Sequence, residues 1–211
     1  MIQLWLREYP ELARESGRVF DAYQGGDFLD IGAFHGWYGL LLAPKAAPGD
    51  SFVAIEPDPQ ALPPLLQTSK VLRGLFPRLS LSVVDKPVGD GGRAVRTQPS
   101  GDKSHPSFRS VDAAEAGCPT LTVDELVGAL RLRPTFIKVD VEGAEHSVLR
   151  GMRGTLAQFR PTLMLEVHPE WLPAPVVVAD VFRLLDEHGY TRVPIDERCL
   201  LCSAPREQRR V

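Results

Sequence analysis

Short β-rich runs alternate with helix-like stretches along this chain, and that alternation limits its possible folds more than any other feature. Five apolar runs of strand length stand at residues 28–31, 51–55, 79–84, 136–139 and 162–167. Strands that alternate with helices are typical of βαβ units, which build a parallel sheet covered by helices on both faces. The pattern therefore predicts an α/β fold, doubly wound around a mostly parallel sheet.

Two stretches have the periodicity of helices. Apolar residues recur at the spacing of one helical face at Ala144, Val148, Leu149, Met152 and Leu156. A second helix is expected to begin at Pro175, because proline suits a first turn, and to run to Gly189. Residues 190–203 contain two more β-like pieces, and the short link between them favours an antiparallel pair.

The length of 211 residues favours one domain with one core. Residues 1–26 carry apolar side chains compatible with one or two helices, which form a lid over a ligand or extra core cover. Residues 27–205 are expected to form the domain itself, and the basic C-terminus predicts a flexible tail at 206–211. Residues 86–118 are rich in Gly, Pro, Ser and Asp without a period. They therefore form a functional loop, a disordered segment or hidden short strands.

Composition excludes several classes of protein. Hydrophobic residues make up 44% and charged residues 24% of the chain, so it can bury a core and is not disordered. No run approaches the roughly 18–20 apolar residues that a membrane crossing needs, and the charged N-terminus does not have the pattern of a signal peptide. A cytoplasmic protein without membrane partners is expected. The net charge of −3 gives no electrostatic indication of a nucleic-acid partner.

Cys199 and Cys202 have the spacing of a zinc-binding pair. No second Cys or His pair accompanies them, and positions three apart in a strand point to opposite faces. We therefore expect two buried, reduced core cysteines.

The segment FLDIGAFHGWYG, residues 28–39, is the first candidate for ligand binding. A strand ends at Asp30, and Gly32 and Gly36 then bracket a tight turn, where glycine lets the backbone approach a ligand closely. Open parallel sheets bind ligands at the carboxyl ends of their strands, where this loop would lie. The spacing D-x-G-x-x-x-G departs from G-x-G-x-x-G and favours a cofactor without phosphates. A purely structural glycine turn is the alternative.

Glu56 stands at the end of the second strand, in the segment FVAIEPDP. The two oxygens of a carboxylate there can accept hydrogen bonds from both hydroxyls of a ribose. Alternatively, Glu56 and Asp58 precede a helix and favour its dipole. In combination with the glycine loop, ribose binding is the better interpretation.

Charged side chains interrupt two strands that should be apolar on both faces. Lys138, Asp140 and Glu142 alternate onto one face of the segment FIKVDVEGAE, where burial is costly unless they are paired or functional. Glu166 and His168 share a face near the next strand's end, and an imidazole there suits acid–base chemistry. The alternatives are a structural Lys138–Asp140 pair, acids that favour the next helix dipole, and a histidine that caps its strand.

These segments together resemble the FkbM family of methyltransferases, which depend on S-adenosylmethionine (SAM). The resemblance is carried by DIGAFHG, IEPDP, FIKVDVEGAEHSVLRGM and PTLMLEVHPE, and it covers roughly residues 27–170. It implies a seven-stranded sheet whose last strand is antiparallel, with 27–205 as the methyltransferase domain. It also implies that Asp30, Gly32 and Gly36 line the methionine part of SAM. Glu56 would bind the ribose, and Asp85 or Lys86 would lie near the adenine.

The sequence thus predicts a SAM-dependent methyltransferase that acts on a hydroxyl of a small molecule, such as a sugar or a secondary metabolite. His168 is the expected general base, and Asp140 orients the acceptor or the base. In a less favoured rival, Asp140, Glu166 and His168 hold a divalent ion that acidifies the hydroxyl. Other classes are a non-catalytic SAM- or nucleotide-binding regulator and a nicotinamide-dependent oxidoreductase.

The expected site residues fall into two groups, and no resident metal is expected. The cofactor-binding group comprises Asp30, Gly32, Ala33, Phe34, Gly36, Trp37, Glu56, Pro57, Asp85 and Lys86. The catalytic group comprises Asp140, His168, Lys138 and Glu142. The acceptor's identity and the oligomeric state stay open at this point.

Overall fold

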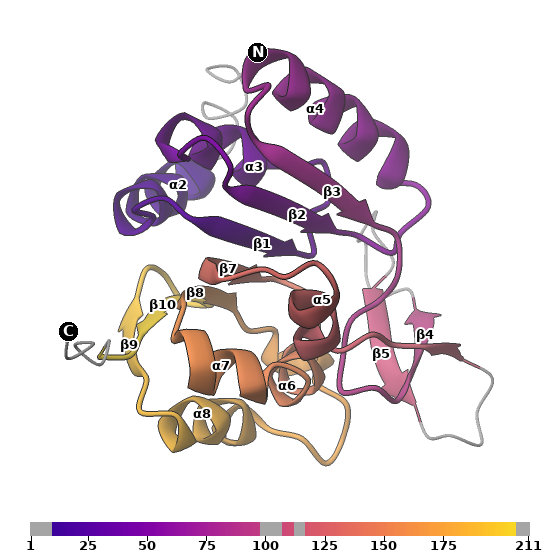
Figure 1. The fold of residues 1–211 in the computed structure, drawn as a ribbon. Helices are drawn as coiled ribbons and strands as arrows, with labels where there is room; N and C mark the ends of the chain where they lie inside the picture. The colour runs from indigo at the N-terminus through magenta and orange to yellow at the C-terminus, as the bar shows by residue number, and fades with distance from the viewer. Residues whose placement is uncertain (1–9, 98–106, 112–116, 206–211) are drawn as a thin grey trace.

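A seven-stranded sheet forms the centre of the computed structural model, which describes residues 10–97, 107–111 and 117–205 (Figure 1). The strand order is β3-β2-β1-β7-β8-β10-β9. The strands are β1 (Asp27–Ile31), β2 (Ser51–Ile55), β3 (Ser80–Val84), β7 (Pro134–Val139), β8 (Thr162–Glu166), β9 (Thr191–Pro194) and β10 (Cys199–Ser203).

Five of the strands, β3, β2, β1, β7 and β8, pair in parallel. The last strand, β10, runs antiparallel to both of its neighbours, β8 and β9. The chain order reverses direction across the sheet at the β1–β7 boundary, where open α/β sheets bind their ligands. The predicted doubly wound sheet with an antiparallel last strand is confirmed.

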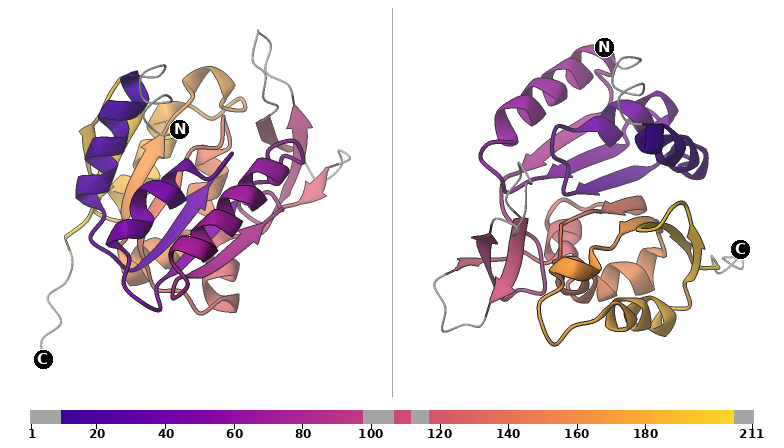
Figure 2. Two further views of the ribbon diagram at one scale, coloured as in Figure 1. Left: turned by 90° about the horizontal axis from the view of Figure 1, so that it is seen from above. Right: turned by 180° about the vertical axis from the view of Figure 1, so that it is seen from behind.

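Helices cover both faces of this sheet (Figures 1 and 2). One face carries α2 (Pro10–Ala22), α3 (Trp37–Leu42), the short η1 (Ala43–Lys45) and α4 (Leu62–Leu75). The other face carries α5 (Val123–Ala129), α6 (Glu145–Arg150), α7 (Arg153–Phe159) and α8 (Val178–Glu187). Every helix among the described residues falls short of the length and apolarity that a bilayer crossing requires.

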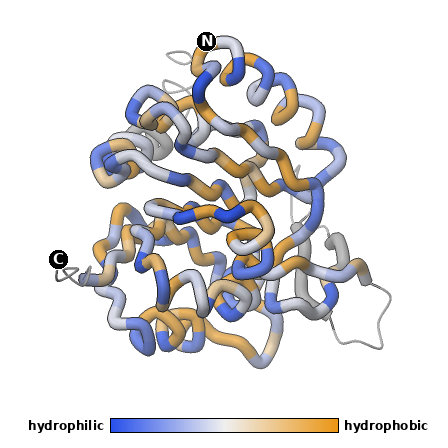
Figure 3. The backbone as a smooth tube through the Cα atoms, viewed as in Figure 1, coloured by the Kyte–Doolittle hydropathy of each residue, from blue (hydrophilic) through white to orange (hydrophobic). Residues whose placement is uncertain are grey.

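The two faces of the sheet each have their own core, because successive side chains of a strand point in opposite directions. Phe28, Phe52 and Phe136 form a row across β2, β1 and β7, and the Phe28 ring centroid lies 5.2 Å from that of Phe52. They pack with Val19 of α2 and with Tyr23, which directly follows that helix. Their chain neighbours Leu29, Val53 and Ile137 belong to the core under α5–α8. Figure 3 shows apolar stretches both in the strands and on the helices that cover them.

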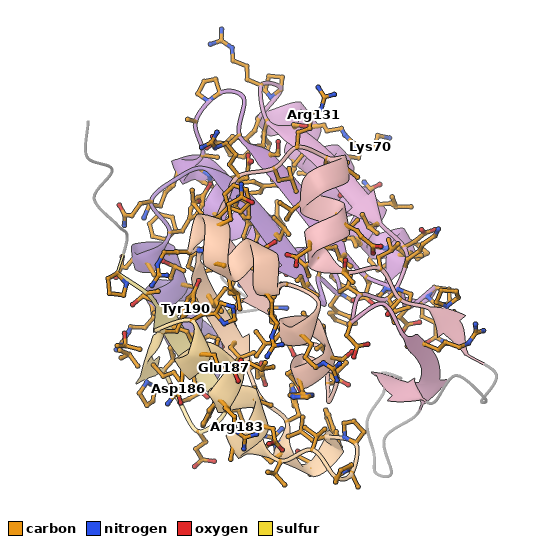
Figure 4. All side chains as sticks on the ribbon, turned by 60° about the horizontal axis from the view of Figure 1, so that its bottom comes forward. Lys70, Arg131, Arg183, Asp186, Glu187 and Tyr190 are labelled. Carbon is orange, nitrogen blue, oxygen red and sulfur yellow. The ribbon has the colours of Figure 1, made fainter. Side chains whose placement is uncertain are left out.

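Cys199 and Cys202 confirm the two-faced pattern. Both are buried free cysteines, and they belong to different cores on opposite faces of the sheet. The outer surface of α8, by contrast, is charged: Arg183, Asp186 and Glu187 are all substantially exposed (Figure 4).

Two predictions about elements need correction, and for residues 86–118 one of the expected alternatives, hidden short strands, is confirmed. The helical face at 144–156 is buried as expected, but the helix is broken into α6 and α7 at Gly151, where an added Cβ would lie 1.8 Å from the Gly89 carbonyl oxygen. The helix expected from Pro175 begins only at Val178, after a cis Ala174–Pro175 bond. Residues 86–118 contain short strands: β4 (Arg93–Thr97), β5 (Ser107–Val111) and β6 (Cys118–Pro119) form a second, antiparallel sheet.

The N-terminal extension contains one described helix, α2, and its Ser16 hydroxyl accepts a hydrogen bond from the Trp37 indole at 2.9 Å. The side chains of Leu4, Trp5, Tyr9 and Leu12, and the predicted tail at 206–211, lie outside the described residues. The domain boundaries at 26/27 and 205/206 stay predictions.

Candidate functional site

A cavity of about 220 Å³ opens at the carboxyl ends of β1, β2 and β7. The loops that follow these three strands supply most of its wall, and the segment after β3 closes one side. Pro87 and Val88 belong to that segment, and backbone hydrogen bonds from Leu121 to Pro87 and from Gly89 to Leu121 hold it in place. The cavity therefore lies where the topology predicts a ligand.

Gly32 lets the loop after β1 pass against the end of β7. Its φ is +79°, and an added Cβ would lie 1.7 Å from the carbonyl oxygen of Asp140. Such an approach excludes every other residue type. Gly36 also has a positive φ, of +80°, but its close neighbours are Leu65 and Thr68 of α4. The first glycine thus shapes the cavity, whereas the second packs α3 against α4.

Glu56 is a buried carboxylate on the cavity wall, with a residue exposure of 8%. Its Oε2 accepts a hydrogen bond from the Phe34 N–H at 2.8 Å, and its Oε1 accepts one from the Asp58 N–H at 2.9 Å. Burial raises its pKa, although these two bonds oppose the shift. Because α4 begins only at Leu62 and has no acid in its first turn, the helix-dipole explanation does not account for Glu56.

Lys138 is a buried cation that ties the ends of β1 and β7 together. Its Nζ donates to the Gly32 carbonyl at 2.6 Å and lies 3.5 Å from Asp30 Oδ1 and 3.2 Å from Asp140 Oδ2. Burial lowers its pKa, but Asp140 and Asp30 outweigh burial and raise the pKa above its usual range. Burial also raises the pKa of Asp30 to about 6, against the opposing effect of Lys138. Asp30 therefore pairs with Lys138 behind the cavity wall and does not line the cavity.

His168 is fixed on three sides just after β8. Its Nδ1 lies 2.9 Å from Glu145 Oε1, its Nε2 lies 3.2 Å from Glu166 Oε1, and the Trp171 ring stacks on it at 4.8 Å. Burial lowers its pKa, yet hydrogen bonds to Glu145 and Glu166 outweigh burial and raise the pKa to about 10. Each ring nitrogen thus faces a carboxylate oxygen, an arrangement that favours the protonated imidazole.

The carboxyl ends of β7 and β8 bring three potential metal ligands together. One oxygen each of Asp140 and Glu166 and one nitrogen of His168 lie within 4.8 Å of one another. Two carboxylates and an imidazole can share a proton or hold a divalent ion.

Sequence reasoning located part of the cavity wall. Of the expected cofactor residues, Gly32, Phe34, Glu56 and Pro57 line the cavity, and of the expected catalytic residues, Asp140 and Glu142 do. The other expected residues lie off the wall: Asp85 and Lys86 are exposed, Asp30 and Lys138 are buried behind it, and Ala33, Gly36, Trp37 and His168 support the loops around it.

Other residues of the site were missed. Glu145 holds His168. The rest of the wall is formed by Ile31, Ile55, Asp58, Pro87, Val88, Val141 and Ala144. Pro87 and Val88 directly follow Asp85 and Lys86. The cavity-lining part of this segment therefore begins two residues after the predicted position. Glu145 belongs to a recognised motif, but only the structure brings it to His168.

The strand order, the antiparallel last strand and the acid at the end of β2 define a protein with the class I methyltransferase fold. The sequence model of the methyltransferase FkbM domain matches residues 30–192. The chain belongs to this family. A search of curated proteins finds no significant match.

Three solved structures share the fold at low sequence identity. Methyltransferase FkbM of Methylobacillus flagellatus KT matches with a TM-score of 0.56 and 20% identity, over 85% of this chain and 44% of that one. A Clostridium thermocellum protein provisionally named as an rRNA methylase matches with a TM-score of 0.53 and 8% identity, over 92% and 96% of the two chains. A provisionally named O-methyltransferase of Klebsiella pneumoniae matches with a TM-score of 0.50 and 12% identity, over 92% of this chain and 79% of that one. The chain thus spans less than half of the first relative.

Proposed function

We propose that this chain is a SAM-dependent methyltransferase that methylates a hydroxyl group of a small molecule. The observation that carries the proposal is Glu56, a carboxylate that faces the cavity while a backbone N–H holds each of its oxygens. An oxygen that accepts one hydrogen bond retains capacity for a second. Glu56 is therefore pre-organised to accept the two hydroxyls of a ribose.

The charge of the cavity favours SAM over a dinucleotide. Glu56, Asp58, Asp140 and Glu142 all line it, and no described residue on its wall is basic. A pyrophosphate would face four carboxylates there, which is unfavourable, whereas the sulfonium and ammonium groups of SAM would be attracted. This argues against a nicotinamide-dependent oxidoreductase.

When bound, SAM supplies a methyl group that is already activated for transfer. The chain then has to place an acceptor oxygen in line with that group and remove the proton from it. We assign the placing of the acceptor to Asp140, which lines the cavity and is held by Lys138. Glu142, on the same wall, is proposed to contact the acceptor.

We assign the acceptor's proton to His168, whose Nε2 lies 3.2 Å from Glu166 Oε1 and which lies in one cluster with Asp140. Glu145 and Trp171 keep the ring in place. An imidazole accepts a proton only at a nitrogen that carries none. The proton on Nε2 therefore has to pass to Glu166 when the acceptor binds, and Nε2 then takes the acceptor's proton. A pure binding protein would have no need of this buried arrangement, which argues against a non-catalytic regulator.

Glu56→Ala should weaken SAM binding by roughly 30- to 150-fold, because it removes charge-assisted ribose contacts on the order of 2–3 kcal/mol. Isothermal titration calorimetry of both proteins with SAM measures this. Glu187→Ala, which removes an exposed glutamate of α8, is the control and should bind SAM normally. Equal affinity of the Glu56 variant and the wild type would contradict ribose binding.

A small acceptor is favoured over RNA by the negative net charge and by the acidic cavity wall. The provisionally named rRNA methylase of similar fold makes RNA the alternative to test. Methyl transfer from labelled SAM to a panel of hydroxyl-bearing small molecules should occur while structured RNA stays unlabelled. Labelling of RNA alone would overturn the choice of acceptor.

A further inference from the structure

Asp140, Glu166 and His168 converge at the ends of two adjacent parallel strands, β7 and β8. We infer that these three side chains bind a divalent first-row metal ion, such as Mn²⁺, beside the cavity. The inference deepens the proposed function and rests on it for the role of the ion, but not for its binding.

The distances between the donor atoms suit such an ion. Donors at about 2.1 Å from a metal and roughly 90–110° apart are separated by about 3.0–3.4 Å. His168 Nε2 and Glu166 Oε1 are 3.2 Å apart. All three donor atoms lie within 4.8 Å of one another, so side-chain rotations that close the widest pair by up to about 1.4 Å bring them into coordination range. Lys138 Nζ lies 3.2 Å from Oδ2 of Asp140 and holds this carboxylate in place.

His168 has the second partner that metal-binding histidines generally have. Such histidines donate their other ring N–H to a carboxylate or carbonyl, which fixes the ring and directs the free nitrogen at the metal. Here the Nδ1–H donates to Glu145, which is fully buried and is itself held by the Gly143 N–H at 2.9 Å. The stacked Trp171 ring prevents the imidazole from turning away.

The mixed donor set indicates which ions fit. Two carboxylates suit Mg²⁺ and Mn²⁺, whereas the imidazole favours Mn²⁺ and Zn²⁺ over Mg²⁺. The carboxylates are partly open, with side-chain exposures of 25% for Glu166 and 29% for Asp140, so an ion and an acceptor oxygen can both reach them. With the ion bound, His168 Nε2 would be a metal ligand in place of the proton acceptor assigned above. An acceptor hydroxyl on the ion would then release its proton to water more readily, and its oxygen would keep the electron pair.

Electron paramagnetic resonance of Mn²⁺, added to protein first treated with a chelator, tests the inference without SAM or acceptor. Wild-type protein should bind one Mn²⁺ per chain and show nitrogen coupling from the imidazole in pulsed spectra. Asp140→Asn and Glu166→Gln should each weaken binding at least about tenfold, and Glu145→Gln by about 10- to 100-fold. His168→Gln should remove the nitrogen coupling. Glu187→Gln, the exposed control on α8, should bind normally.

Absence of saturable Mn²⁺ binding up to millimolar concentration would overturn the inference, as would nitrogen coupling that persists in His168→Gln. Circular dichroism of each variant confirms that its fold is intact, and Glu166→Gln, at a partly exposed position, provides a second variant if His168→Gln fails to fold. Calorimetry with SAM on the metal-free wild type separates the two proposals. SAM binding without Mn²⁺ binding refutes the metal site alone, and Mn²⁺ binding without SAM binding refutes the proposed function alone.

Discussion

Lys138→Met should lower the free energy of unfolding by about 3–5 kcal/mol, because it leaves the carboxylate of Asp30 buried without its cation. Asp30 is 2% exposed, and neither of its oxygens has a hydrogen-bond partner among the described residues. Methionine has a similar length, so the loss of charge dominates over the loss of volume. Urea unfolding at neutral pH, followed by circular dichroism, measures the change.

The double variant Asp30→Asn, Lys138→Met is the matched control for this charge effect. Removing both charges should restore at least about half of the lost stability, since a neutral buried pair lacks the uncompensated carboxylate. If the free energy of unfolding of Lys138→Met lies within about 1 kcal/mol of the wild-type value, the ion pair does not stabilise the ends of β1 and β7.

His168→Ala should reduce the turnover of methyl transfer by roughly 10²- to 10⁴-fold, which is the contribution typical of a positioned acid–base group. Affinity for SAM should stay within about twofold, because His168 lies off the cavity wall that contains Glu56. Single-turnover kinetics with a competent acceptor, and calorimetry with SAM, measure the two quantities separately.

Cys199→Ala is the structural control for that experiment. Cys199 pairs with Glu166 across the β10–β8 ladder and is buried, so its substitution disturbs the same region of the sheet without touching the acceptor site. Its turnover should stay close to that of the wild type. Full activity of His168→Ala would assign the acceptor's proton to another group.

The parts of the site that sequence could predict are those fixed by short-range chemistry. Gly32 and Glu56 stand directly after apolar strands, and the order of a parallel sheet brings such positions to one edge. The alternation of Lys138 and Asp140 on one face follows from the twofold repeat of a strand, and the structure pairs them at 3.2 Å.

The parts that sequence could not predict depend on contacts between distant segments. Glu145 reads as an ordinary acid at a helix start, and only the packing of α6 beside β8 brings it to His168. The break between α6 and α7 arises because the Gly89 backbone approaches Gly151, a contact between residues 62 positions apart in the chain.

Calorimetry with SAM and with NAD⁺ tests the central claim, that the acidic cavity at the ends of β1, β2 and β7 binds a SAM-type cofactor through Glu56. We expect SAM and its demethylated product to bind with a dissociation constant of about 1 μM, equivalent to about −8 kcal/mol. NAD⁺ should produce no binding heat, because its pyrophosphate would meet Glu56, Asp58, Asp140 and Glu142. Tight binding of NAD⁺ with no heat from SAM would contradict the account.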